Sequence, residues 1–232
     1  SGLLLPKQAR YRAALHPVEL LTMELYHSFR RETNFSVCSR YGGGNGTGES
    51  RENRMTKQMD LKKKMRVIEG FPGPGISYKD ITTILSDADA LKAMVEQLAD
   101  AAKEWDFDYV LGTESRGFIV GVPVAALLHK GFIMARKPGK LPGNLIKKSY
   151  TLEYGEAAIE VDRDSIPDGA RVLVMDDLLA TGGTAKTACE LVEAAGGVVA
   201  GTLFLTELTD LGGRKVLEEA GYKVKALLTW TN

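Results

Sequence analysis

From about Met59 onward, short apolar runs alternate with stretches of helical periodicity. Ser86 and Asp89 form a capping-box-like helix start. One apolar face follows at helical spacing, with Leu91, Met94, Val95, Leu98 and Trp105. Compact apolar runs predict strands at 109–112, 132–135, 157–161, 171–175, 198–205 and 223–228. Strands separated by helices indicate an α/β domain with a mainly parallel, twisted sheet flanked by helices.

The first 58 residues lack this alternation. Residues 40–50, RYGGGNGTGES, and the basic run 51–66 have the composition of a flexible linker. We therefore expect residues 1–58 to be a poorly structured or loosely attached extension, and residues 59–232 to form the folded domain. Met55 and Met59 would both serve as translation starts, so the extension is either genuine or partly upstream sequence.

Composition narrows the class of protein. At 232 residues with 44% hydrophobic content, the chain can bury one substantial core. Thirty basic and thirty acidic residues cancel, which argues against a charge field for nucleic acid or an anionic membrane. Two cysteines are too few for a disulfide framework, and no apolar run reaches the ~18 residues of a membrane span. We expect a cytoplasmic protein with no membrane or nucleic-acid partner.

The stretch VLVMDDLLATGGT (172–184) carries the strongest chemical signal. An apolar strand leads into a glycine-rich turn, and a helix follows to about Ala195. The helix start directs free backbone amides and a positive dipole end at the turn, where the Thr181 and Thr184 hydroxyls add donors. This combination predicts a site for a phosphate monoester.

Asp176 and Asp177 stand where they should repel that phosphate. A plain strand-to-helix turn would explain the glycines but not these two acids. Both make sense if the ligand carries hydroxyls beside its phosphate. The two carboxylates would accept hydrogen bonds from vicinal ribose hydroxyls and favour positive charge on the sugar ring.

Two further motifs follow predicted strands. In GTESRGF (112–118), Glu114 and Arg116 form either an anion loop or a simple surface ion pair. Residues 131–152 carry five basic residues and no acid, which fits a local anion site, a nucleic-acid patch or a solvated loop. The five are Arg136, Lys137, Lys140, Lys147 and Lys148.

VLVMDDLLATGGT closely resembles the 5-phosphoribosyl 1-diphosphate (PRPP) signature of type I phosphoribosyltransferases. Within it, DDLLATGGT is similar to the motif of the adenine-specific members. The resemblance covers about residues 59–217. It implies a Rossmann-like sheet with a small base-binding hood and a mobile lid. It also implies that Asp176 and Asp177 hold the ribose, and that Ala180, Thr181, Gly182, Gly183 and Thr184 hold the 5-phosphate. The pyrophosphate side would comprise Glu114, Ser115, Arg116, Gly117, Arg136, Lys137 and Lys140.

The same resemblance assigns the lid and the base site. SYTLEYGEAAIEV (149–161) matches the lid, in which Glu153 and Tyr154 would close over the base and serve catalysis. A carboxyl group shielded from water can exchange a proton with a purine nitrogen, so Glu153 is the candidate general acid/base. Adenine would contact Ser77, Lys79 and Leu208. Many family members have arginine at the position of Lys79, so a point charge replaces a planar fork.

The implied reaction is purine salvage: adenine and PRPP give AMP and pyrophosphate. Mg²⁺ would be carried by PRPP and pyrophosphate, with no protein metal site, and the enzyme would be a homodimer. One alternative is an orotate or 6-oxopurine transferase, although KVKALLTWTN (223–232) lacks the lysine and aromatic-aspartate pattern of the 6-oxopurine enzymes. Another is a PRPP-sensing, nucleic-acid-binding regulator with residues 51–66 as its arm. The Glu153–Tyr154 pair favours catalysis.

Overall fold

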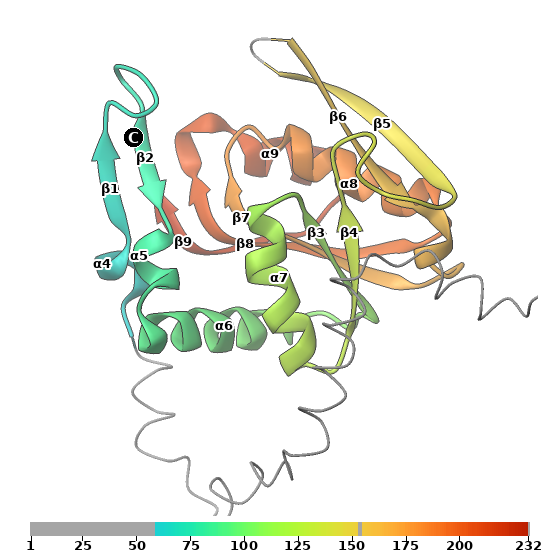
Figure 1. Ribbon diagram of the computed structural model, residues 1–232, viewed down its shortest axis with the longest axis horizontal. Coiled ribbons are helices and arrows are strands. Elements are labelled where there is room, and N and C mark those ends of the chain that lie inside the picture. The colour runs from blue at the N-terminus through green and yellow to red at the C-terminus, as the bar shows by residue number, and fades with distance from the viewer. Residues whose placement is uncertain (1–58, 153–154, 232) are drawn as a thin grey trace, which may run out of the picture. The chain divides into compact units, whose positions relative to one another are not determined.

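A parallel sheet forms the centre of the computed structural model, which describes residues 59–152 and 155–231. Its strands lie in the order β4-β3-β7-β8-β9, and every neighbouring pair is parallel (Figure 1). The strands are β3 (Tyr109–Thr113), β4 (Gly131–Ala135), β7 (Arg171–Leu179), β8 (Val198–Leu208) and β9 (Val224–Trp230). The predicted α/β class with a mainly parallel sheet is confirmed.

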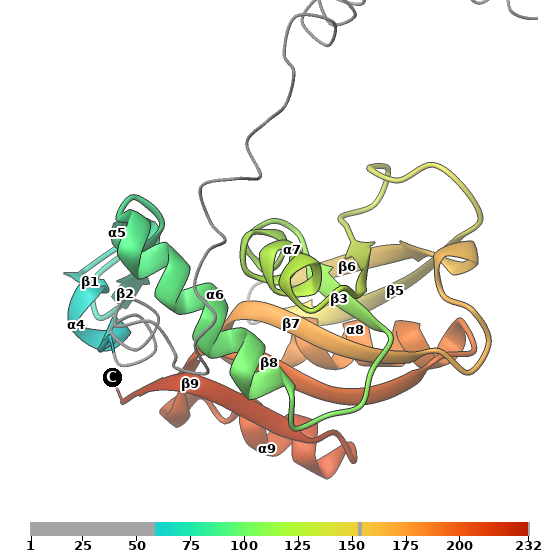
Figure 2. The ribbon, with the colours of Figure 1, turned by 90° about the horizontal axis from the view of Figure 1, so that it is seen from below.

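Helices cover both faces of this sheet (Figure 2). On one face lie α6 (Ala88–Ala102) and α7 (Arg116–Leu127), and on the other α8 (Gly183–Ala194) and α9 (Gly213–Glu219). The packing of strand β7 explains why residues 172–175 are all apolar. Leu173 and Met175 pack into the core beneath α6 and α7, whereas Val172 and Val174 pack toward α8. A strand that is buried on both faces has no solvent-facing side, so polar residues do not alternate with apolar ones along it.

Two antiparallel hairpins stand beside the sheet. One pairs β1 (Arg66–Glu69) with β2 (Ser77–Asp80), between the short helices α4 (Leu61–Lys64) and α5 (Thr82–Leu85). The other pairs β5 (Leu145–Leu152) with β6 (Gly155–Asp162). Short 3₁₀ turns span Arg163–Ser165 and Thr209–Leu211.

The helix start predicted at Ser86 is wrong by one residue. The N-cap of α6 is Asp87, whose carboxylate accepts the backbone N–H groups of Asp89 and Ala90, each at 3.1 Å. Ser86 instead ends α5 in helical conformation, so its hydroxyl cannot occupy the cap. Trp105 lies beyond the end of the helix but still packs into the same core.

Strand boundaries also differ. Strand β7 continues through Leu179, so Asp176 and Asp177 lie within it rather than after it. Strands β1, β2 and β5 were not predicted; β5 includes the polar run Lys147 to Ser149, which hides the apolar signal of a strand.

Several sequence-based expectations fall on residues outside the described ranges. These are the extension 1–58 and the catalytic pair Glu153 and Tyr154, which stay predictions. Every helix in residues 59–152 and 155–231 is too short or too polar to span a bilayer.

Candidate active site

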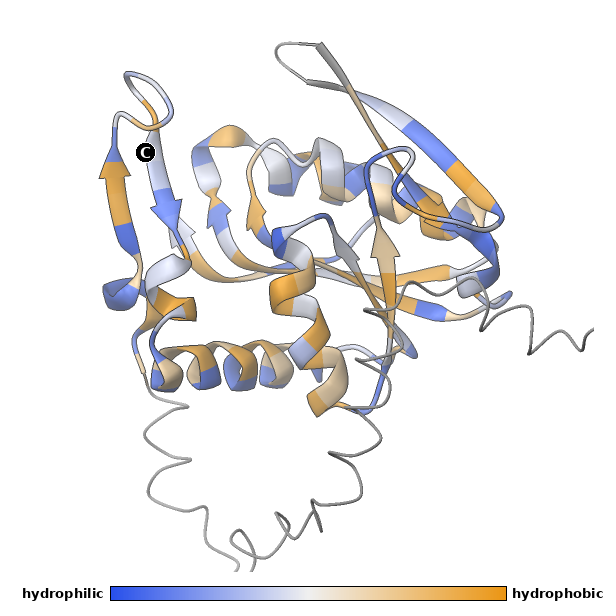
Figure 3. Ribbon diagram, in the orientation of Figure 1, coloured by the Kyte–Doolittle hydropathy of each residue, from blue (hydrophilic) through white to orange (hydrophobic). Residues whose placement is uncertain are grey.

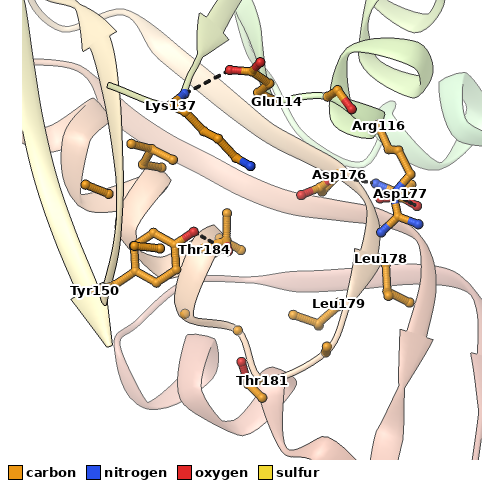
Figure 4. Close-up of a pocket in the computed structure, with 18 of the residues that line it drawn as sticks. Glu114, Arg116, Lys137, Tyr150, Asp176, Asp177, Leu178, Leu179, Thr181 and Thr184 are labelled. Carbon is orange, nitrogen blue, oxygen red and sulfur yellow. Dashed lines mark hydrogen bonds and ion pairs between the residues drawn. The ribbon is translucent and has the colours of Figure 1, made fainter. Parts of the chain in front are cut away.

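A pocket with a volume of about 510 Å³ opens at the carboxyl ends of β3, β4 and β7 (Figure 4). Ligands of open α/β sheets bind at this edge because the loops that follow the parallel strands converge there. The lining comprises residues 114–116, 137–138, Tyr150, 157–159 and 176–185. Four stretches that were treated separately in the sequence, 112–118, 131–152, 149–161 and 172–184, therefore meet in one cavity.

The glycine-rich turn forms one end of the pocket. Gly182, the N-cap of α8, has a φ of 84° and provides no side-chain cap, so the first backbone N–H groups of the helix have no cap partner among the described residues. Gly213 packs against this turn from outside. A Cβ on Gly213 would lie 2.2 Å from the Ala180 carbonyl oxygen, and a Cβ on Gly182 would lie 2.8 Å from the Gly213 carbonyl oxygen. Contact between two glycines thus fixes the shape of the turn.

Asp176 and Asp177 enter the pocket from the end of β7. Asp176 accepts a hydrogen bond from the Thr113 hydroxyl through Oδ2 and one from the Asp177 backbone N–H through Oδ1 at 2.8 Å. The Asp177 Oδ2 atom lies 3.1 Å from Arg116 Nε, but among the described residues no donor is aligned for a hydrogen bond to it. Asp177 Oδ2 is thus buried in contact with Arg116.

Burial raises the pKa of both carboxyl groups. Asp176 keeps some surface open to the pocket, yet protein surrounds most of it. Desolvation, followed by the charge of Asp177, raises the pKa of Asp176 to about 8. Desolvation also raises the pKa of Asp177, whereas Arg116 acts in the opposite direction. The pair can therefore hold a proton near neutral pH before any ligand binds.

The loop between β3 and α7 places Arg116 over these acids. The peptide bond between Glu114 and Ser115 is cis. A Cβ on Gly117 would come within 2.9 Å of the Thr113 hydroxyl and 3.1 Å of Asp176 Oδ1. Gly117 is not part of the cavity lining, and its missing side chain lets α7 start against the carboxylate.

The basic loop after β4 contributes fewer charges to the pocket than its composition suggests. The Arg136 guanidinium lies 3.3 Å from both Glu114 carboxylate oxygens and donates to the Lys140 carbonyl oxygen at 3.0 Å. Neither Arg136 nor Lys140 lines the pocket, whereas Lys137 does and extends into it (Figure 4). Hydrogen bonds from the Lys137 backbone N–H and from Arg136 lower the pKa of Glu114.

A second carboxylate holds the rest of that loop. Glu160 on β6 is 4% exposed, and its Oε1 accepts backbone N–H groups from Gly139, Lys140 and Leu141 at 2.9, 3.3 and 3.4 Å. Its backbone also pairs with that of Arg136. Two glutamates therefore hold the basic loop.

The three residues predicted to contact the base do not line this pocket. Lys79 is 7% exposed, and its Nζ lies 2.6 Å from Ser77 Oγ and 4.9 Å from the centre of the Trp230 ring. Leu208 is buried at the end of β8. A neighbouring residue, Tyr78, accepts a hydrogen bond from Arg116 NH1 at 3.0 Å through its phenol oxygen.

Sequence reasoning missed several residues that the fold brings to this site, including two tyrosines. Tyr78 reaches Arg116, and Leu178 and Tyr150 line the pocket. The sequence did not mark either tyrosine, because Tyr78 depends on how β2 lies beside Arg116 and Tyr150 on how β5 packs on α8. Within the described residues, no group of three or more His, Cys, Asp or Glu side chains could hold a metal ion.

An uncapped helix start after a strand with two adjacent carboxylates is the arrangement that the sequence motif predicted, and comparison with known proteins gives the class. The family model described as phosphoribosyl transferase domain matches residues 77–224. An adenine phosphoribosyltransferase of Clostridium perfringens (strain SM101) is 53% identical over 172 residues, which cover 74% of this chain and 99% of that relative. The chain belongs to the phosphoribosyltransferase family and, within it, to the adenine phosphoribosyltransferases.

Solved structures give the same result. The adenine phosphoribosyltransferase of Thermoanaerobacter pseudethanolicus superposes with a TM-score of 0.70 at 45% identity, covering 73% of this chain and 98% of that one. The enzyme of Saccharomyces cerevisiae, solved with an imino-altritol bisphosphate and adenine, has a TM-score of 0.69 at 36% identity. The superposition covers 75% of this chain and 99% of the Saccharomyces cerevisiae chain.

Proposed function

We propose that this pocket transfers the 5-phosphoribosyl group of PRPP to adenine and releases AMP and pyrophosphate. One observation carries the proposal: Asp176 and Asp177 stand in the same cavity as the uncapped start of α8. A ligand with a phosphate and neighbouring hydroxyls matches both features. Membership of the adenine phosphoribosyltransferases supports adenine as the base.

The sugar phosphate lies along β7 in this proposal. Residues Ala180 to Thr184 bind the 5-phosphate through backbone N–H groups and threonine hydroxyls. Asp176 and Asp177 accept hydrogen bonds from the ribose hydroxyls, and the surface that Asp176 keeps open to the pocket supports that role. Negative charge there favours the cationic sugar that develops as the bond to pyrophosphate breaks.

Arg116 and Lys137 stabilise the departing pyrophosphate, since both line the pocket and carry positive charge. Glu114, Ser115 and Gly117 shape the loop around Arg116. We now propose that Arg136 and Lys140 act indirectly: Arg136 is paired with Glu114, and the Lys140 backbone is held by Glu160.

The base side retains the assignments that come from family resemblance. Bond formation between adenine N9 and the anomeric carbon releases the N9 proton, and Glu153 is the proposed acceptor, assisted by Tyr154. Ser77, Lys79 and Leu208 stay proposed base contacts. We add Tyr78, because its phenol is bound to Arg116 and its ring offers a face for a purine.

Mg²⁺ fits this site as an ion carried by the substrate. Arg116 and Thr113 already engage the two aspartates, so the ion would rest mainly on diphosphate oxygens. There it would neutralise the charge of the leaving group.

A homodimer and a cytoplasmic location are further proposals. An exposed apolar surface supports the dimer: Ile119, Val122 and Leu127 on α7 are 42%, 46% and 52% exposed, and Met134 on the edge strand β4 is 45% exposed. Figure 3 shows the apolar character of α7. Such surfaces commonly become buried on association.

A base panel tests the proposed function. Purified protein, PRPP and Mg²⁺ are incubated separately with adenine, hypoxanthine, guanine and orotate, and nucleotide products are measured. We expect AMP formation at least ~10²-fold more efficient, in kcat/KM, than any other product. Turnover of another base, or salt-sensitive nucleic-acid binding without any turnover, would replace this function with an alternative.

A further inference from the structure

Tyr150 on β5 contacts the proposed phosphate turn directly. Its hydroxyl oxygen lies 3.0 Å from Thr184 Oγ1, in the first turn of α8 (Figure 4). Its ring lies beside Gly183, where a Cβ would be 3.4 Å from the nearest ring carbon. Tyr150 is half-buried and lines the pocket, so its hydroxyl stands between the hairpin and the anion site.

The Tyr150–Thr184 pair can donate one hydrogen bond to a ligand. Each hydroxyl carries one proton, and the bond between Tyr150 and Thr184 uses one of the two. Whichever hydroxyl donates within the pair, the other proton is available to an acceptor in the pocket. A phosphate oxygen is such an acceptor, and Gly182 provides no competing side chain at the helix start.

The position of Tyr150 is fixed by its surroundings. Strand β5 packs on α8, and Lys148 Nζ forms an ion pair with Glu190 Oε2 across the same contact at 3.0 Å. The Tyr150 ring also packs against the core cluster that contains Ala188 and Val192. A donor that is already ordered loses little conformational entropy when a ligand binds.

We propose that Tyr150 is a further residue of the 5-phosphate subsite. It fixes the rotamer of Thr184, and the pair presents one hydroxyl proton to the phosphate. This inference rests on the proposed function only for the identity of the sugar phosphate. It makes the β5–β6 hairpin part of phosphate recognition.

Tyr150→Phe removes the hydroxyl and keeps the ring. Isothermal titration calorimetry with AMP, ribose 5-phosphate and pyrophosphate separates the two anion sites. We expect the Kd values of AMP and ribose 5-phosphate to rise about 10-fold or more, as for one hydrogen bond to a charged group, and that of pyrophosphate to change less than about twofold. In steady-state assays the KM for PRPP rises, with kcat nearly unchanged.

Tyr222→Phe is the matched control. The Tyr222 hydroxyl lies 3.0 Å from Glu193 Oε2 near the other end of α8, away from the pocket residues. It should leave all three affinities unchanged. Thr184→Val removes the partner hydroxyl and should reproduce the selective loss for the two sugar phosphates.

Three results would overturn the inference. These are unchanged AMP and ribose 5-phosphate affinity in Tyr150→Phe, equal weakening of sugar phosphates and pyrophosphate, or an equal loss in Tyr222→Phe. A failed proposed function would look different, because wild-type protein would then form no AMP while ribose 5-phosphate binding still depended on Tyr150.

Discussion

The two loops that face the pocket from opposite sides are built in different ways. The turn at 180–184 offers backbone amides at a helix start and is shaped by contact between Gly182 and Gly213. The loop at 136–141 is rich in positive side chains, but Glu114 and Glu160 accept hydrogen bonds from much of it. The first loop depends on backbone geometry and the second on side-chain pairing.

Because of this difference, the sequence predicts the ligand-binding groups of the first loop better than those of the second. Backbone amides at a helix start can be inferred from glycine and threonine positions, because the geometry is local. The use made of a charged side chain depends on partners that are distant in sequence. Arg136 is paired with Glu114, from another strand end, and so it provides less free charge than its sequence suggests.

Breaking the geometry of the first loop should have the largest effect. Gly182→Ala places a side chain at a φ of 84° and 2.8 Å from the Gly213 carbonyl oxygen. The turn must shift, and we expect kcat/KM for PRPP to fall roughly 10²-fold, since small displacements of a binding loop can cost that much. Steady-state kinetics with varied PRPP measures the effect.

Gly221→Ala is the control for backbone strain. Gly221 has a φ of 88°, but no atom lies within 4 Å of the point where an alanine methyl group would stand. The substitution should lower stability by about 1 kcal/mol, the cost of an L-residue in the left-handed region, and leave the KM for PRPP unchanged. Equal kinetic losses in both variants would show that strain alone, and not the Gly182–Gly213 contact, accounts for the result.

In the second loop, one lysine should account for most of the effect on ligand binding. Lys137→Met removes the positive charge that extends into the pocket, and we expect the KM for PRPP and the Kd of pyrophosphate to rise about 10-fold. Lys140→Met removes a neighbouring charge that lies outside the pocket lining, and its effect should stay below about threefold. Similar losses in both variants would indicate that the whole loop acts as a diffuse positive field.

The fold was largely predictable from the sequence because its signals are local. Apolar runs such as Val172 to Met175 are buried on both faces of the sheet, so they remain recognisable without knowledge of their neighbours. Strand β5 was missed, since Lys147 and Lys148 are exposed and its pairing with β6 is not evident from its own residues. The α6 cap was misplaced by one residue because Ser86 and Asp87 are both good caps, and only the end of α5 decides between them.

The site was predictable as a set of motifs but not as a set of contacts. Asp176, Arg116 and Thr184 meet in one pocket, as expected from their positions near the ends of parallel strands. Tyr150 and Tyr78 could not be chosen from sequence, because their roles depend on how each hairpin lies against the sheet. Family resemblance found Lys137, but it could not separate that residue from Arg136.

The carboxylates beside the two loops, Asp176 on β7 and Glu114 after β3, also titrate in opposite directions. Burial raises the pKa of Asp176 to about 8, so folding takes up a proton there, and its contribution to stability declines as pH rises from about 4 toward 8. Hydrogen bonds lower the pKa of Glu114, so its contribution is present above about pH 4 and is lost as pH falls. Between pH 5 and 8, Asp176 therefore dominates the difference between the two loops.

Asp176→Asn should remove that dependence. The melting temperature of ligand-free wild type is expected to fall relative to the variant between pH 5 and 8, with a limiting slope of about 1.4 kcal/mol per pH unit, or a few degrees per unit. Glu114→Gln is the contrasting variant: its difference from wild type should vary below about pH 5 and stay level above it. Thermal melts across the range measure both. Parallel curves for wild type and Asp176→Asn would mean that Asp176, like Glu114, is already ionised in the free protein.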